Sequence, residues 1–227
     1  MPEPLVESAK PEKALAEVRR RIDDACRRAG RHPEDVRLIG VTKSVPPEQV
    51  RRVAAAGLRE FGENYVGDLE AKRAAAPEAT WHFIGRLQRN KVRRVLDLAD
   101  VVQTLEPGRA TERLGEIAAE REQTVRCMVE VDFTGSRVGV EPEAAEAFLA
   151  ELRELPALEV VGLMTVPPLD RPPRPYFQRL RELRERLSPA FPGLRELSMG
   201  MSADYEEAVE EGATMVRVGS AIFGPRP

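Results

Sequence analysis

Short apolar runs alternate with stretches of helical periodicity from about residue 36 to the end of this chain, and this alternation restricts the fold more than any other feature. The runs are rich in β-branched residues and predict eight strands, at 36–42, 60–64, 81–85, 101–105, 125–132, 160–165, 196–199 and 215–218. Helical patterns lie between them, at 47–56, 66–76, 88–99, 109–121, 143–155, 175–187 and 203–211. Such alternation is typical of right-handed βα units around a parallel sheet.

A parallel sheet of this size can close on itself or stay open. Eight strands in 227 residues favour the α/β class and a closed (β/α)8 barrel of the TIM type, formed by a single domain over 1–227. The alternative is an open doubly wound sheet, but the first strand runs into Gly40-Val41-Thr42-Lys43-Ser44 instead of a GxGxxG turn. An extra N-terminal helix is expected at 11–29, and residues 1–10 are expected to be a flexible segment.

The balance of charge and hydrophobicity excludes several classes of protein. The 35 Lys and Arg residues nearly equal the 38 Asp and Glu residues, whereas a nucleic-acid-binding protein usually has a basic excess. The longest apolar runs are too short to span a bilayer, and the first ten residues lack the apolar segment of a secretory signal. We therefore expect a cytoplasmic protein that binds neither nucleic acid nor membranes. The helices show no spare apolar stripe, which favours a monomer.

The few soft ligands in the chain argue against a metal site. Cys26 and Cys127 are far apart in the sequence, and His32 and His82 are the two histidines, so no pair has the spacing of a zinc site. Both thiols are expected to be inert packing residues.

Lys43 directly follows the first predicted strand and stands out because lysine is rare in this chain. Five of the 35 basic residues are lysines. In a barrel, functional groups lie at the carboxyl ends of the strands. An amine that emerges there from an apolar strand is partly desolvated, which favours its neutral form and allows attack on an aldehyde, a reaction that arginine cannot perform. The alternative is an ordinary solvated lysine.

A second candidate feature follows the last two predicted strands. Many barrels bind phosphate in this position through backbone N–H groups and hydroxyls. Ser202 precedes the helix predicted at 203–211 and can both cap that helix and donate to a phosphate oxygen. Gly219 allows close approach of the backbone, and Ser220 adds a hydroxyl. A plain helix cap and a plain turn are the alternatives.

An amine at one strand end and a phosphate site at two others together indicate a phosphorylated aldehyde as the ligand. Pyridoxal 5'-phosphate (PLP) matches both features, and so does a sugar phosphate in class I aldolase-type chemistry. Arg217 in the last predicted strand favours PLP, because arginine is one of the two usual partners of its pyridine nitrogen. A structural salt bridge is the alternative role of this residue.

Longer motifs surround these positions. In chain order they read Val41-Thr42-Lys43, Phe61-Gly62-Glu63-Asn64-Tyr65, Trp81-His82-Phe83-Ile84-Gly85 with Leu87-Gln88-Arg89-Asn90-Lys91, Gly162-Leu163-Met164-Thr165, Leu197-Ser198-Met199-Gly200-Met201-Ser202, and Arg217-Val218-Gly219-Ser220-Ala221-Ile222-Phe223-Gly224. Together these motifs resemble the PLP homeostasis proteins of the YggS/PROSC type.

The resemblance implies a barrel like the N-terminal domain of bacterial alanine racemase, with PLP held as an internal aldimine on Lys43. It also implies roles for six further residues: Ser202, Gly219 and Ser220 on the phosphate, Arg217 facing the pyridine nitrogen, and Asn64 and Met201 lining the cofactor. His82 is a weaker member of this set, and packing in the third strand is its expected role. The family usually has a longer, lysine-containing loop after the fifth strand, whereas this chain has Arg137 there, so a PLP transfer role for that lysine is in doubt.

A carrier and an enzyme are both compatible with such a site. The resemblance implies a protein without strong catalytic activity that buffers PLP or delivers it to apo PLP-dependent enzymes; the alternative is a PLP-dependent amino-acid racemase. Arg217 opposite the ring nitrogen would keep that nitrogen unprotonated and weaken PLP as an electron sink. Racemisation needs a base on each face of the α-carbon, and Lys43 serves one face. Alanine racemases take the second base from an additional β-domain, which is not expected here, and Tyr65, Tyr176 and Tyr205 are not obvious replacements.

Overall fold

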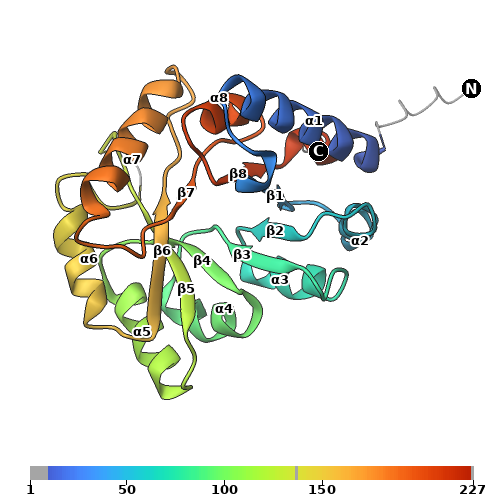
Figure 1. The fold of residues 1–227 in the computed structure, drawn as a ribbon. Coiled ribbons are helices and arrows are strands. Elements are labelled where there is room, and N and C mark those ends of the chain that lie inside the picture. Colours follow the sequence, from blue (N-terminus) through green and yellow to red (C-terminus); the bar gives the residue numbers. More distant parts are fainter. Residues whose placement is uncertain (1–9, 136–137, 226–227) are drawn as a thin grey trace, which may run out of the picture.

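The computed structural model describes residues 10–135 and 138–225. Its parallel strands form a closed barrel in which each strand pairs with the next in sequence and the last pairs with the first (Figure 1). The strands are β1 (Arg37–Val41), β2 (Glu60–Glu63), β3 (Thr80–Phe83), β4 (Val101–Leu105), β5 (Val125–Glu130), β6 (Leu158–Met164), β7 (Glu196–Ser198) and β8 (Met215–Val218). All eight predicted strands are therefore confirmed, and the open doubly wound sheet is excluded.

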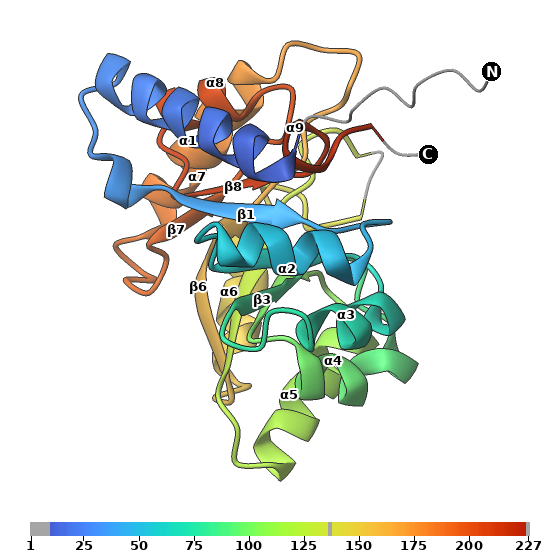
Figure 2. The same cartoon turned by 90° about the vertical axis from the view of Figure 1, so that its right-hand side faces the viewer.

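Helices surround the barrel and cover the outer face of the strands (Figure 1). They are α1 (Pro11–Arg28), α2 (Pro47–Ala55), α3 (Val66–Arg73), α4 (Val92–Leu98), α5 (Arg109–Glu120), α6 (Ala145–Arg153), α7 (Arg174–Leu187), α8 (Tyr205–Glu210) and α9 (Ser220–Phe223). Short 3-10 helices add η1 (Pro33–Asp35) and η2 (Arg89–Lys91). The extra helix α1 is confirmed, and it packs against α8 and α9, so the first helix lies beside the last ones (Figure 2).

The apolar faces of the helices pack on the strands in one large core that includes both cysteines. Cys26 and Cys127 are fully buried, and burial raises the pKa of each thiol, as expected for packing residues. A smaller apolar cluster fills part of the barrel interior, formed by Ile39, Met128, Val161, Met164 and Met215. Polar side chains occupy much of the remaining interior, which the apolar strand pattern did not indicate.

Several predicted boundaries were wrong. The helix predicted at 203–211 begins at Tyr205, so the residue before it is Asp204 and Ser202 is not its cap. The strand predicted at 125–132 ends at Glu130, and the helix predicted at 88–99 begins as the 3-10 turn η2. The short helix α9 replaces the turn considered at Gly219–Ser220, with Gly219 in the N-cap position.

Two expectations concern absent features. Among residues 10–135 and 138–225, no helix has the length and apolar character that a membrane crossing requires. The same residues contain no cluster of three or more His, Cys, Asp or Glu side chains suited to a metal ion. The predicted flexible segment 1–10 lies almost entirely outside the described residues, and the single-domain organisation over 1–227 stays a prediction.

Candidate functional site

The predicted site residues all lie at or near the carboxyl ends of four neighbouring strands. The barrel order places β7, β8, β1 and β2 side by side. Lys43 follows β1 and Asn64 follows β2, and we call these strand ends with the start of α3 the β1–β2 side. Met201 and Ser202 follow β7, whereas Gly219 and Ser220 follow β8; we call these two loops the β7–β8 side. Strand pairing therefore brings together residues from the two ends of the sequence.

Lys43 lies in a tight turn between β1 and α2. Val45 donates its N–H to the Thr42 carbonyl at 2.8 Å, and Ser44 adopts a left-handed φ of 62°. The Lys43 side chain is half-buried, and its Nζ lies 5.3 Å from the ring centroid of Tyr65. This distance is within the range of a cation–π contact. The Lys43 amine therefore lies at the mouth of the barrel and does not extend fully into solvent.

A buried ion pair supports the turn that carries Lys43. Lys72 on α3 donates from Nζ to Glu63 Oε2 at 2.8 Å and to the Thr42 carbonyl at 2.7 Å. The Thr42 hydroxyl donates to the same carboxylate oxygen at 2.7 Å, and the Asn64 N–H donates to Glu63 Oε1 at 3.0 Å. The Lys72 side chain is 5% exposed and that of Glu63 is 0% exposed. This network joins the peptide before Lys43 to the peptide of Asn64.

Lys72 and Glu63 were missed by the sequence analysis, although a signal for Lys72 was present. Val66, Leu69 and Lys72 share the buried face of α3 at a spacing of three residues, so the lysine stands where an apolar residue is expected. A charged residue at such a position requires a buried partner. Glu63 is the last residue of β2 and supplies it.

Asn64 is held from two directions. Its Nδ2 donates to the Ile84 carbonyl at 3.4 Å, a long hydrogen bond to the chain that follows β3. Gly85 lies directly against it: a Cβ at that glycine would lie 2.1 Å from the Asn64 carbonyl oxygen. The close approach requires a residue without a side chain at position 85.

The β7–β8 side is held mainly through the backbone. Ser202 Oγ accepts hydrogen bonds from the N–H groups of Gly219 at 3.1 Å and Ala221 at 3.3 Å, so this serine caps α9 and not the predicted helix. The Arg217 N–H donates to the Gly200 carbonyl at 2.9 Å, which joins the two loops. A Cβ at Gly219 would lie 3.3 Å from the Val41 carbonyl oxygen, so this loop packs against the end of β1.

Met201 and Asp204 complete the loop after β7. The Met201 N–H donates to Asp204 Oδ1 at 2.6 Å. Burial is the main influence on this carboxyl and raises its pKa above the ordinary value, although the Met201 hydrogen bond acts in the opposite direction. Gly200 has a φ of +91°, a conformation that strongly favours glycine.

Arg217 is 4% exposed and points into the barrel at its carboxyl end. Its Nη1 donates to Ser198 Oγ at 2.6 Å and its Nη2 to the Thr165 carbonyl at 2.9 Å, at the ends of β7 and β6. Two hydrogen bonds from one guanidinium fix the plane of the group.

His82 and Arg137 had uncertain roles in the sequence analysis. His82 lies in β3 with 0% exposure, which agrees with a core residue, and its ring bonds to Glu60 and Gln103 instead of lying among the residues of the two sides. Arg137 lies outside the described residues, as does its neighbour at 136.

The sequence of this chain is similar to those of known proteins over most of its length. The family described as "Alanine racemase, N-terminal domain" matches residues 14–227. A pyridoxal phosphate homeostasis protein from Aquifex aeolicus is 41% identical over 93% of this chain and 96% of its own length. One from Pseudomonas aeruginosa is 38% identical over 93% of this chain and 94% of its own length.

Solved structures agree with these sequence matches. PipY from Synechococcus elongatus PCC7942, determined with PLP bound, has a TM-score of 0.83 at 35% identity, and the match covers 94% of this chain and 100% of PipY. Alanine racemase from Clostridium difficile 630 has a TM-score of 0.74 at 16% identity, with 93% of this chain and 60% of the racemase covered, a likeness of fold alone. This chain belongs to the family of pyridoxal phosphate homeostasis proteins, which is built on the alanine racemase N-terminal domain.

Proposed function

We propose that this protein binds PLP and serves in PLP homeostasis, with the Lys43 amine as the covalent attachment point for the cofactor aldehyde. The observation that carries the proposal is the position of Lys43 one strand away from a loop that presents hydroxyl and N–H groups. Gly219 packs against the end of β1, so the amine and that loop share one edge of the barrel. An aldehyde and a phosphate on one small molecule require this combination.

The donor set on the β7–β8 side fits a phosphate group. Ser202 Oγ already accepts two N–H groups, so its own proton is directed elsewhere and is suited to an external oxygen. The N–H of Ser220 has no acceptor within the described part of the chain, and its side chain is exposed. Hydroxyl and N–H donors of this kind bind phosphate oxygens.

Arg217 fits the opposite end of the ring. Bound PLP acts as an electron sink for the group attached at its aldehyde carbon. This effect is strongest when the ring nitrogen is protonated. A guanidinium has no proton acceptor and remains charged, so Arg217 next to that nitrogen would oppose its protonation. We infer that Asn64 and Met201 line the ring between Lys43 and the phosphate group.

A carrier role fits these residues better than catalysis. Lys43 is the basic side chain of the β1–β2 side that faces solvent, because the other amine there, Lys72, is buried in its ion pair. A ring nitrogen kept unprotonated by Arg217 would deprive racemisation of a strong electron sink. The racemases similar to this chain share its fold at 16% identity, which does not extend to their activity.

The proposal extends to partners and location. PipY was determined both with and without PLP, which agrees with reversible occupancy in that protein. We propose that the present protein holds the reactive aldehyde reversibly, passes it to apo PLP-dependent enzymes, and does so in the cytoplasm as a monomer.

The visible absorption spectrum of the purified protein tests the attachment point. Wild-type protein with added PLP should show a band that Lys43→Ala lacks, and borohydride reduction followed by peptide mass spectrometry should place a pyridoxyl adduct on Lys43. Lys91→Ala, the same change at an exposed lysine, is the matched control and should keep the band. Absence of the band in wild-type protein with excess PLP would reject the proposal and favour the sugar-phosphate alternative.

The distinction between carrier and enzyme needs a second assay. PLP-loaded protein should exchange the α-proton of amino acids far more slowly than a PLP enzyme does. When it is mixed with an apo PLP-dependent enzyme, the activity of that enzyme should be restored. Rapid α-proton exchange by wild-type protein that is absent from Lys43→Ala would favour the racemase.

A further inference from the structure

A continuous chain of hydrogen bonds runs through the barrel interior and ends at Arg217. Arg217 Nη1 donates to Ser198 Oγ at 2.6 Å, and Ser198 Oγ donates to Gln103 Oε1 at 2.7 Å. Gln103 Nε2 lies 2.8 Å from His82 Nδ1, and His82 Nε2 lies 2.8 Å from Glu60 Oε2. The chain thus connects β8, β7, β4, β3 and β2 across the barrel.

The two ends of this series of hydrogen bonds have opposite chemistry, because one group can only donate and the other only accepts. At one end, the Arg217 guanidinium can only donate. At the other, Glu60 Oε2 lies 2.8 Å from His82 Nε2, and its carboxylate lies 3.9 Å from the charged group of Arg37, contacts that favour an ionised carboxylate. An ionised carboxylate only accepts, so His82 Nε2 donates to Glu60.

Gln103 is oriented in agreement with this direction. Its Nε2 also contacts the thioether sulfur of Met215 at 3.5 Å, a weak acceptor. A flipped amide would direct its oxygen at that sulfur and its N–H groups at Ser198, which would leave the serine hydroxyl without its present acceptor. In this orientation the Gln103 amide donates to Nδ1 of His82, so Nδ1 is the acceptor and Nε2 carries the proton donated to Glu60.

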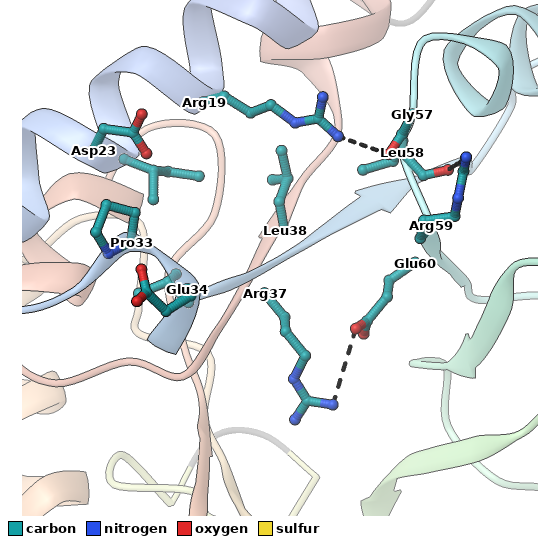
Figure 3. Close-up of a pocket in the computed structure, with 12 residues that line it drawn as sticks. Arg19, Asp23, Pro33, Glu34, Arg37, Leu38, Gly57, Leu58, Arg59 and Glu60 are labelled. Atoms are coloured by element: carbon teal, nitrogen blue, oxygen red, sulfur yellow. Dashed lines mark hydrogen bonds and ion pairs between the residues drawn. The ribbon is translucent and has the colours of Figure 1, made fainter.

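The far end of the chain is open to water. Glu60 lines a hollow of about 420 Å³ at the amino-terminal ends of β1 and β2, together with Arg19, Arg37 and Arg59 (Figure 3). Figure 3 shows Arg37 beside Glu60, and their nearest charged atoms are 3.9 Å apart. The Glu60 side chain is 18% exposed, whereas His82, Gln103 and Ser198 are completely buried. A charged group at the base of the barrel is thereby connected to the arginine at its mouth.

We propose that Ser198, Gln103 and His82 are positioning residues for Arg217, held in a single hydrogen-bond direction that Glu60 sets from the amino-terminal end of the barrel. The acceptors of Arg217 include the Ser198 oxygen, which stays an acceptor because its own proton is committed to Gln103. The orientation of the guanidinium toward the ring nitrogen then depends on the tautomer of a histidine that does not touch the cofactor. The consequence for the cofactor rests on the proposed function, whereas the direction of the chain does not.

Nitrogen-15 NMR of the two histidines tests the direction without cofactor. The protein sequence contains two histidines, His32 and His82, and the His32 side chain is 81% exposed. Long-range ¹H–¹⁵N spectra of the apo protein should show His82 protonated on Nε2 and unprotonated on Nδ1, and Ser198→Ala should shift the His82 signals while those of His32 stay unchanged. A proton on Nδ1 of His82 in the wild-type protein would overturn the proposal.

Titration of the same samples with PLP tests the coupling. The His82 signals of wild-type protein should move on saturation, and Ser198→Ala should lose this response and bind PLP about tenfold more weakly, as expected for one broken hydrogen bond to a charged group. Met128→Leu, a volume-conserving change in the apolar part of the same interior, is the control and should keep both. Ser198→Cys, whose thiol is a weaker hydrogen-bonding group, serves if Ser198→Ala does not fold.

The results of these experiments distinguish the positioning role from the proposed PLP-binding function. A wild-type response that persists in Ser198→Ala with unchanged affinity would overturn the positioning role. Failure of wild-type protein to bind PLP would overturn the proposed function and the effect on the cofactor, and the apo spectra would still decide the direction of the chain.

Discussion

The two sides of the barrel mouth are held together by different kinds of interaction. The β1–β2 side depends on charged side chains, since Lys72 and Glu63 form a buried ion pair that fixes the peptides next to Lys43 and Asn64. The β7–β8 side depends on backbone contacts and on glycines, because Ser202 bonds to two N–H groups and Gly219 packs on β1.

This difference follows from what each side would bind. An amine that reacts with an aldehyde must be held precisely yet remain free, so its support comes from neighbours. A phosphate is instead surrounded by donors, which requires the backbone to approach closely. The β1–β2 side should therefore be sensitive to loss of charge, and the β7–β8 side to added bulk.

Lys72→Met should have the largest effect on stability. It leaves the Glu63 carboxylate buried without its cation, and breaking one partner of a buried pair costs about 3–5 kcal/mol. Urea denaturation should show this loss in the free energy of unfolding. Lys91→Met, the same change at an exposed lysine, should leave the unfolding midpoint nearly unchanged.

The double variant Lys72→Met with Glu63→Gln sharpens this prediction. Removing both charges should recover part of the lost stability, because the uncompensated carboxylate is no longer present. Equal losses in the single and double variants would show that packing of the lysine stem, and not its charge, supports the β1–β2 side.

Gly200→Ala should have the next largest effect, through added bulk and an unfavourable backbone conformation. A Cβ at this position would lie 2.5 Å from the Ala208 Cβ and 3.0 Å from the Tyr205 Cα, and the φ of +91° is itself unfavourable for alanine. We expect a loss of about 2–3 kcal/mol in thermal or chemical unfolding. Gly67→Ala in α3, where a Cβ meets nothing within 4 Å, should be neutral or slightly stabilising.

Ser202→Ala should weaken both stability and ligand binding on the β7–β8 side. The N–H groups of Gly219 and Ala221 lose their common acceptor, which costs about 1–2 kcal/mol, and PLP affinity should fall because a donor is also removed. Calorimetric titration and unfolding of the same sample measure both effects. Ser188→Ala at the exposed end of α7 is the control, and a similar change there would argue against a specific role of Ser202.

The smallest expected effect concerns pH and the half-buried carboxyl of Asp204 on the β7–β8 side. Burial raises its pKa above the ordinary 3.8, so the folded protein binds this proton more tightly than the unfolded chain does. The resulting stabilisation is present below pH 3.8 and is lost as the pH rises through the raised pKa. Asp204→Asn should remove this component from the pH dependence of unfolding, and an unchanged profile would show that the carboxyl is solvated.

The sequence predicted the barrel well because the strand pattern is local. Each apolar run is short, is covered on both faces and is followed by a helix, so the order of elements could be read along the chain. Lys43, Arg217 and the two loops near the end of the chain could be selected as candidates in the same way, because the ends of barrel strands are known sites of function.

The interactions that support these residues could not be predicted in the same way. Lys72 shares a helix face with Val66 and Leu69, but its partner Glu63 lies on another element, and only the fold brings them together. Ser202 was assigned to the nearer helix, whereas the structure connects it to α9, because α8 begins two residues later than predicted. A boundary error of this size is enough to change which helix a serine caps.

The seam between β1 and β8 has a further consequence for folding. The site draws on residues near positions 43 and 219, so it is complete only when the first and last strands have paired. Contacts between such distant segments form late, since closing a long loop is entropically costly. A partly folded chain with an open seam would contain the amine but not the loop beside it, and a ligand that binds only the closed barrel would stabilise the pairing. The ligand would then hold the first and last strands together through the loops after β1 and β8.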